Sequence, residues 1–520
     1  MHCHCRDTKD GRTALNVFVL FGIVPTRSFS SPGCCDLPRP VECKPPPVPN
    51  PATVMPSVTV AGAVEIGAVT PRGEAPTIEF NSTGSKGWVI HMSGGGWGFR
   101  KNTTTAGGRF RRDGAPLYGG GSGEEASLFL SGSAGTAAKP APAPPPGCYL
   151  KCDGIMSADP DINPMFHEFN KVFIPINDGT SFTGDLAEPI PASNPPVYPN
   201  KWPIYIRGGR IVTAVMSFLM KDHGMAGATE VIITGGSSGG MAVYLNCDRI
   251  ADQIHTVNPK IRVTCLADAG MFLDHPGLSG EPTLSPNFVE SFYAWNSSAM
   301  TNQACIAHYT PLRTPWKCIF SQCVRVCSTR TARCTALSPV FRWWELETPD
   351  EWADAVPPRS DVCDGHCRRY VLPFIKTPLF VAQNLYDSYQ LGHILTLGGC
   401  STYGKDLSAC PPATVAAIQA YGATMRGIIN GGLAAPGANR GSFAPSCIAH
   451  CQTVANEHPA ALWNWPARWG IHPGTAESGD DAVTPELAFA AWYEKGAGAP
   501  GSNITQACDF GCNPKCPLYT

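Results

Sequence analysis

One short segment of the sequence has the residue types and spacing of a nucleophile in a tight turn. The run Gly235-Gly-Ser-Ser-Gly-Gly240 follows the apolar residues 230–234 and precedes residues with helical spacing. Glycines two positions before and after a serine permit a sharp strand-to-helix turn, because a Cβ there would collide with neighbouring backbone. Two registers fit the Gly-x-Ser-x-Gly pattern, with Ser237 or Ser238 at its centre, and the spacing does not separate them.

A reactive serine needs a histidine base that is held by a carboxylate, and α/β hydrolases supply the three in the chain order serine, acid, histidine. Asp387 follows the apolar run 378–383, at the sheet edge where α/β folds assemble their sites, so we predict it as the acid. Four histidines come after it: His393, His450, His458 and His472. His450 stands between Cys447 and Cys451, which could restrain its loop, but the pattern alone favours a structural role or an exposed position over a catalytic role for each histidine.

The run Gly94-Gly-Gly-Trp97 lies shortly after the apolar residues 87–92. Consecutive glycines let backbone N–H groups approach an oxyanion that a Cβ would block, and the loss of one such donor typically lowers a rate about 10²–10³-fold. A similar motif, Cys305-Ile-Ala-His308, precedes Asp387 and is therefore in the wrong order to supply the base.

These residues must be positioned by strands and helices that the hydrophobic pattern also predicts. Five nearly continuous apolar runs have strand length: 87–92, 171–176, 230–234, 261–266 and 378–383. Such runs indicate strands that are covered on both faces, as in a parallel sheet. Residues with helical spacing lie between them, at 211–219 and 241–245. We therefore predict an α/β fold with a mostly parallel central sheet flanked by helices.

Composition excludes several classes of protein. Charged residues make up 15% of the 520 residues and hydrophobic residues 43%, so charge repulsion cannot keep most of the chain unfolded. Thirty-nine basic and 41 acidic side chains give a net charge of −2, which supplies no field for a phosphate backbone. Nucleic acid is therefore not an expected partner.

The N-terminal region has the features of a secretory leader. Basic residues precede the apolar run 14–24, and Ser28 and Ser30 occupy positions −3 and −1 of a cleavage site, which predicts a signal peptide over residues 1–30. The alternative is an uncleaved signal anchor. Apart from that possibility, we predict no integral association with a membrane.

The domain organisation follows from low-complexity segments. We predict a proline-rich spacer at 31–55, a single hydrolase-like domain at 56–520 with a low-complexity insertion at about 105–147, and a cysteine-rich C-terminal tail.

The 23 cysteines indicate an oxidising compartment, and we favour disulfide bonds over zinc ligation. Several cysteines have Cys-x-x-x-Cys spacing, which in a helix aims both thiols side by side, so each should bond a neighbouring segment. Removal of the leader leaves an odd number of cysteines, so at least one is unpaired or pairs between chains. Four sequons predict N-glycosylation: Asn81, Asn102, Asn296 and Asn503.

Together, the ordered motifs resemble the pectin acetylesterase/Notum family of secreted serine carboxylesterases. The similar blocks are 88–97, 163–164 with 178–185, 207–210, 235–240, 265–270, 386–388 and 447–450. The resemblance implies an α/β-hydrolase-like, disulfide-rich fold, with Ser237 as nucleophile, Asp387 as acid and His450 as base. It further implies an oxyanion hole formed by the N–H groups of Gly96, Trp97 and Ser238, the last of which replaces the family's usual alanine.

The resemblance implies hydrolysis of O-acetyl esters on a cell-wall polysaccharide such as pectin, outside the cell or in its wall, without a metal or other cofactor. Two alternatives remain open. One is removal of a longer acyl chain from a protein, as in the animal branch of the family, and the other is an inactive relative that binds glycan. The sequence does not indicate an oligomeric state.

Overall fold

The computed structural model describes residues 2–5, 41–44, 55–99, 117–118, 154–175, 178–191, 203–320, 322–323, 370–397, 407–433, 439–453, 483–513 and 516. The chain divides into two compact units, Met1–Thr53 and Val54–Thr520. In the first unit, β1 (His2–Cys5) pairs antiparallel with β2 (Val41–Lys44). The apolar run of the predicted leader and most of the predicted insertion lie outside the described residues, so the leader, spacer and insertion remain predictions.

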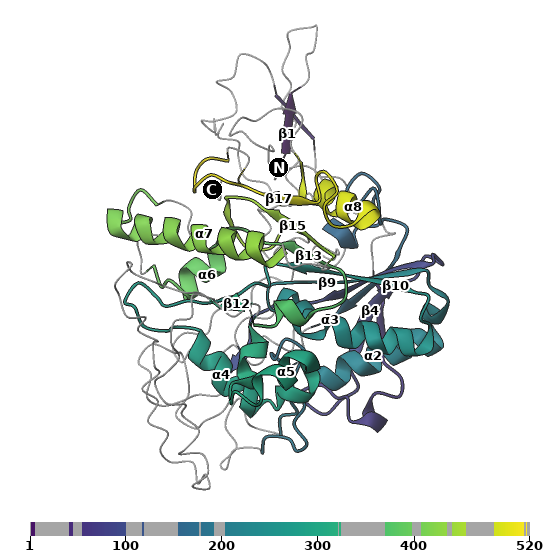
Figure 1. Ribbon diagram of the computed structural model, residues 1–520. Helices are drawn as coiled ribbons and strands as arrows, with labels where there is room; N and C mark the ends of the chain where they lie inside the picture. The colour runs from purple at the N-terminus through teal and green to yellow at the C-terminus, as the bar shows by residue number, and fades with distance from the viewer. Residues whose placement is uncertain are drawn as a thin grey trace, which may run out of the picture. The chain divides into compact units, whose positions relative to one another are not determined.

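A nine-stranded sheet forms the centre of the second unit (Figure 1). Its strands lie in the order β17 (Asn503–Thr505), β15 (Arg440–Ala444), β13 (Leu379–Ala382), β10 (Arg262–Asp268), β9 (Glu230–Gly236), β5 (Gly87–Met92), β8 (Asn170–Ile174), β4 (Thr77–Asn81) and β3 (Ser57–Thr59). Every neighbouring pair from β17 to β8 is parallel, and only the pairs that include β4 are antiparallel. The prediction of a mostly parallel sheet is confirmed.

All five predicted strand runs belong to this sheet. The run 87–92 coincides with β5, whereas β9 and β10 each continue two residues beyond the predicted end. The extension arises because the backbone of Gly235 and Gly236 keeps pairing with Ala267 and Asp268, although glycine adds no side chain to the apolar pattern.

Helices cover both faces of the sheet. They are α2 (Gly208–Asp222), α3 (Ser238–Val257), α4 (Ser285–Ala294), α5 (Gln303–Tyr309), α6 (Ser388–His393), α7 (Pro412–Leu433) and α8 (Pro485–Lys495). Helices α2 and α3 lie on one face and α8 on the other (Figure 1). Alternate strand residues divide accordingly, with Val231 and Ile233 in the core that includes α2 and α3 while Ile232 packs in the core that includes Trp492 of α8. The central strands are thus buried on both sides, which explains their continuous apolarity.

The strand order brings the carboxyl ends of β5, β9, β10, β13 and β15 to one edge of the sheet. The chain passes from β5 to β8 on one side and later to β9 on the other, which makes β5 a topological switch point. In open α/β sheets, ligands bind at the carboxyl ends of the strands beside such a point.

Three short strand pairs flank the sheet: β6 (Gly98–Phe99) with β7 (Leu117–Tyr118), β11 (Leu273–Asp274) with β12 (Gln322–Cys323), and β14 (Tyr386–Asp387) with β16 (Ile448–Ala449). No helix in the described part of the chain is long and apolar enough to cross a membrane.

Disulfide bonds join segments of the second unit. The pairs between described cysteines are Cys247–Cys265, Cys305–Cys318, Cys447–Cys516 and Cys508–Cys512. The prediction that the Cys-x-x-x-Cys cysteines bond other segments holds for Cys447 but is wrong for Cys508 and Cys512. Residues 508–512 form a turn instead of a helix, so the two thiols can meet. Among the described cysteines, Cys451 is free and buried.

Candidate active site

Ser237 occupies the turn between β9 and α3. Its backbone has φ 58° and ψ −124°, a conformation that a non-glycine residue rarely adopts. Its N–H donates to the carbonyl oxygen of Asp268 at 2.9 Å, and its own carbonyl accepts the N–H of Met241 at 2.9 Å. The strained residue is therefore held from the neighbouring strand and from the first turn of α3.

The glycines on either side of Ser237 are required by close backbone packing. A Cβ on Gly235 would meet the carbonyl of Met92 at 2.8 Å, and one on Gly239 would meet Ser93 backbone atoms at 2.8 Å. These two glycines stand two residues before and after Ser237, so the geometry fits the register centred on Ser237. The Ser238 hydroxyl is buried, and no described residue forms a hydrogen bond with it.

The structure brings Ser237, His450 and Asp387 into one hydrogen-bonded chain. His450 Nε2 lies 2.7 Å from Ser237 Oγ, and His450 Nδ1 lies 2.8 Å from Asp387 Oδ2. Asp387 is fully buried, and its carboxylate also accepts the backbone N–H of Gln390 at 3.1 Å. Because the carboxylate accepts from Nδ1–H, the Nε2 lone pair is directed at the serine hydroxyl.

A two-stranded parallel ladder sets the distance between the acid and the base. In the β14–β16 pair, Asp387 lies opposite Ala449, the residue before His450. The disulfide Cys447–Cys516 and a hydrogen bond from Ser446 N to Gln506 Oε1 tie this second strand to the C-terminal tail. Residues that are 63 positions apart in the chain thereby meet.

The acid and base are electrostatically coupled. Burial lowers the pKa of His450, but the adjacent Asp387 carboxylate and the Cys451 side chain together outweigh this effect, and the pKa stands well above its ordinary value of 6.5. Ionised Asp387 therefore favours the protonated form of His450.

The loop after β5 supplies backbone donors beside Ser237. Gly95 and Gly96 have φ values of 149° and 85°, which favour glycine. The N–H groups of Gly96 and Ser238 donate to no acceptor among the described residues. A Cβ on Gly94 would lie 2.9 Å from the Cβ of Ser237, so this loop and the turn that carries Ser237 are in direct contact.

Comparisons with known proteins agree with this geometry. The sequence profile of the pectinacetylesterase family matches residues 148–331 and 359–517, which is more than half of the chain. The chain belongs to the pectinacetylesterase family. The predictions of this family and of a carboxylic ester hydrolase are confirmed.

One relative and one solved structure of another protein each align with most of this chain. Pectin acetylesterase 11 of Arabidopsis thaliana is 23% identical over 482 residues, covering 90% of this chain and 94% of the relative. Palmitoleoyl-protein carboxylesterase NOTUM of Drosophila melanogaster is 28% identical over 301 residues, covering 57% of this chain and 34% of that protein. The crystal structure of the Wnt deacylase Notum from Drosophila superposes with a TM-score of 0.55 at 21% identity, covering 89% of this chain and 99% of that chain. This likeness confirms the α/β-hydrolase-like fold.

Aromatic rings fill the space next to the hydrogen-bonded chain of this pectinacetylesterase-family protein. The Trp97 ring contacts Phe272 and Phe288 edge-on, with centroids 4.6 and 4.8 Å apart, and all three residues are at most 2% exposed. The Tyr389 ring stacks on the imidazole of His450 at 5.5 Å. The site is therefore bordered by packed rings on the side of Trp97.

Two buried polar residues of the site escaped the sequence analysis. Asp268 Oδ2 accepts the N–H groups of Gln452 and Thr453, both at 2.6 Å, and the Thr453 hydroxyl at 2.8 Å. Burial raises the pKa of Asp268 to about 6, against the lowering effect of these donors. The second residue, Ser181, contacts Trp97 and Ser238. Both residues lie in family blocks, but nothing in those blocks indicates their partners.

The remaining predicted sites lie elsewhere. His308 sits on α5, where its ring contacts Tyr309 and Phe374. Among the sequons, Asn296 and Asn503 are exposed, Asn81 is half-buried, and Asn102 is outside the described residues.

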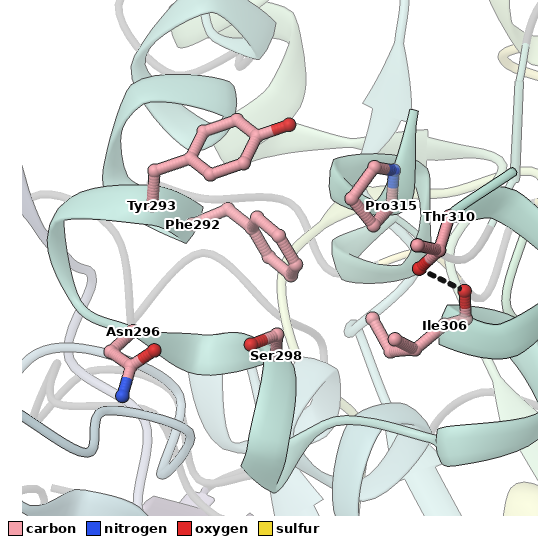
Figure 2. A pocket seen from close by; sticks show the side chains of 7 residues that line it. All are labelled: Phe292, Tyr293, Asn296, Ser298, Ile306, Thr310 and Pro315. Carbon is pink, nitrogen blue, oxygen red and sulfur yellow. Dashed lines mark hydrogen bonds between the residues drawn. The ribbon is translucent and has the colours of Figure 1, made fainter. Parts of the chain in front are cut away.

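A pocket of about 280 Å³ is lined by none of the residues predicted for catalysis (Figure 2). Its lining comes from α4, α5 and nearby segments and consists of Phe292, Tyr293, Asn296, Ser298, Ile306, Thr310 and Pro315. Across the described part of the chain, no group of three or more His, Cys, Asp or Glu side chains could hold a metal ion.

Proposed function

We propose that the protein is a secreted serine esterase that removes O-acetyl groups from a cell-wall polysaccharide such as pectin. The observation that carries this proposal is the continuous hydrogen-bonded chain from Ser237 Oγ through His450 to Asp387. Its position at the carboxyl ends of β9, β13 and β15 is where this fold class binds its ligands.

In the proposed reaction, His450 Nε2 takes the hydroxyl proton of Ser237 as Ser237 Oγ attacks the ester carbonyl carbon. The N–H groups of Gly96, Trp97 and Ser238 stabilise the negative oxygen of the tetrahedral intermediate. His450 then gives the proton to the leaving alcohol oxygen, which releases the sugar and leaves an acyl-serine. Water attacks this acyl-serine with His450 again as base, which frees acetate and restores Ser237.

The preference for a short acyl group rests on the aromatic packing. Trp97 adjoins the proposed oxyanion donors, and its ring is in contact with buried Phe272 and Phe288. Interiors are close-packed, so a long acyl chain could enter on this side only by displacing these rings. An acetyl group requires no such displacement.

Secretion is supported by the disulfide bonds and by the exposure of the sequon residues Asn296 and Asn503. We therefore expect the mature protein to be extracellular or associated with the cell wall, with N-glycans at these two residues.

The test is acyl release by the purified, secreted protein from a series of esters of increasing chain length, with Ser237→Ala as the inactive control. We expect cleavage of acetyl esters that depends on Ser237 and decreases with chain length, followed by release of acetate from acetylated pectin. A preference for long chains would instead assign a protein deacylase, and no turnover at any length would indicate a glycan-binding relative.

Ser238→Ala is the register control. The variant removes the buried, unpartnered hydroxyl but keeps the backbone N–H, so its loss of activity should be far smaller than that of Ser237→Ala. The reverse order of effects would mean that Ser238 is the nucleophile.

A further inference from the structure

Ser181 connects the two segments that carry the proposed oxyanion donors. Its hydroxyl lies 2.7 Å from Nε1 of Trp97, in the loop after β5. The same hydroxyl lies 2.8 Å from the carbonyl oxygen of Ser238, the first residue of α3. Ser181 is fully buried, so water cannot replace either contact without entering the core.

The chemistry of the partners leaves one arrangement of these hydrogen bonds. An indole N–H can only donate and a carbonyl oxygen can only accept. The hydroxyl of Ser181 must therefore accept from Trp97 and donate to Ser238, which uses its single hydrogen and one of its two lone pairs. A side chain without a hydroxyl would lose both of these buried hydrogen bonds and with them the direct link between Trp97 and Ser238.

The backbone around Ser181 is held in an unfavourable conformation. Ser181 and Phe182 have φ values of 48° and 57°, where residues with a Cβ are strained. The carbonyl of Ser181 accepts the Asn246 side chain at 3.3 Å, and the nearby Asp178 carboxylate accepts the N–H and hydroxyl of Thr180 at 3.2 and 2.7 Å. Strain of this kind persists only where surrounding contacts impose it, and here those contacts direct the Ser181 hydroxyl between Trp97 and Ser238.

We propose that Ser181 is a positioning residue that sets the separation between the oxyanion donors of the β5 loop and that of α3. This inference rests on the proposed function. Ser181 does not touch the reacting atoms and acts through Trp97 and Ser238. Loss of its hydroxyl would let the two segments shift apart, so stabilisation of the intermediate would weaken while substrate binding would change little.

The test compares Ser181→Gly and Ser181→Ala with the parent protein. Both variants remove the hydroxyl, but glycine also relieves the positive φ, so Ser181→Gly should be the better folded of the two. We expect kcat for an acetyl ester to fall about 10- to 100-fold in both variants, with KM within about twofold. Affinity for methylboronic acid, which forms a tetrahedral adduct with the serine, should fall in parallel with kcat/KM.

Ser297→Ala is the matched control. Ser297 is also fully buried, and its hydroxyl oxygen lies 3.0 Å from that of Thr183, in the same loop as Ser181. Among the hydrogen bonds of the described residues, the Ser297 hydroxyl has none to Trp97 or Ser238. Its kcat should stay within about twofold of the parent value, as expected for a hydroxyl with no link to the donors.

The outcomes separate this inference from the proposed function. If Ser237→Ala is inactive while Ser181→Gly keeps the parent kcat, Ser181 does not position the donors and the inference fails alone. A rise in KM at constant kcat would also overturn it, because Ser181 would then organise substrate binding. Activity that persists in Ser237→Ala would overturn both proposals.

Discussion

The nucleophile turn, residues 235–240, and the base loops, residues 383–390 and 445–453, meet at the same edge of the sheet. The nucleophile turn is one contiguous segment whose shape requires glycines without side chains. A Cβ on Gly240, for example, would lie 3.0 Å from the Cα of Gly270. The base loops are far apart in sequence and depend on groups that are present, namely the β14–β16 ladder, the Asp268 carboxylate and the Cys447–Cys516 disulfide.

This difference indicates how each half of the site should fail. Added atoms should disrupt the nucleophile turn, because its neighbours are backbone atoms that cannot move aside. Deleted groups should disrupt the base loops, because the ladder, the Asp268 carboxylate and the disulfide position the segments that carry Asp387 and His450. The following substitutions test this contrast.

The largest effect is expected from His450→Ala. Loss of the base should lower kcat at least about 10⁴-fold with little change in melting temperature. The matched control is His308→Ala, which removes an exposed histidine from the same Cys-Ile-Ala-His pattern and should retain the parent rate. Equal losses in the two variants, measured as acetyl ester hydrolysis, would show that His450 is not the base.

The next effect is expected on removal of the tail disulfide. Cys447→Ser with Cys516→Ser opens a bond that spans 69 residues, which should lower the free energy of unfolding by about 4 kcal/mol. Cys508→Ser with Cys512→Ser opens one that spans only 4 residues, so its loss should be smaller. Chemical denaturation of both double variants measures the difference, and a larger loss for the short loop would contradict it.

Asp268→Ala should have an intermediate effect on the base loops. It leaves the buried N–H groups of Gln452 and Thr453 without their acceptor, at a cost of about 3 kcal/mol, and should release the loop that carries His450. Asp268→Asn keeps an acceptor oxygen and should lose less stability and less kcat. If the two variants behave alike in denaturation and in turnover, the hydrogen bonds are not what holds the loop.

Gly239→Ala tests the nucleophile turn. Its Cβ would press on Ser93 backbone atoms at 2.8 Å, so we expect a loss of about 1–3 kcal/mol in stability. Gly427 of α7 is the control, because its Cβ would meet nothing within 4 Å, and Gly427→Ala should stabilise the helix by up to about 1 kcal/mol. Changes in the free energy of unfolding that have the same sign in the two variants, relative to the parent protein, would refute the steric account.

The smallest effect is a pH dependence. His450 must be neutral to accept the Ser237 proton, and its pKa is raised, so kcat/KM should keep rising with pH above 6.5. The contribution of His450 to the free energy of unfolding has the opposite pH dependence, because its pKa is higher in the folded than in the unfolded protein. His450 stabilises the fold fully below its unfolded-state pKa, and this stabilisation is lost as pH rises through its folded-state pKa. Asp387→Asn should lower the pKa of His450, so kcat/KM should rise with pH at lower pH values than in the parent protein. An unchanged pH profile of kcat/KM would argue against the coupling of Asp387 and His450.

The sequence predicted the local parts of this molecule well. The five strand runs, the glycine turn and the position of Asp387 beyond β13 could all be read from neighbouring residues. The spacing left Ser237 and Ser238 equivalent, and His450 was distinguished from the other histidines only by the family resemblance. The disulfide Cys508–Cys512 was missed because a helix was assumed where the chain makes a turn.

Asp268 and Ser181 could not be found from sequence, because their partners are distant. The Asp268 carboxylate binds Gln452 N across 184 positions, and the Ser181 hydroxyl binds the Ser238 carbonyl across 57. Hydrophobic periodicity and glycine spacing indicate the local structure of the segment that contains a residue, because they arise from the strand pleat, the helical turn and local sterics. The amino-acid sequence by itself determined the strands of the sheet and the glycine-flanked turn after β9. Only the tertiary structure decided which polar groups meet at the edge of that sheet, because the packing of the strands and helices sets the distances between segments that are far apart in the chain.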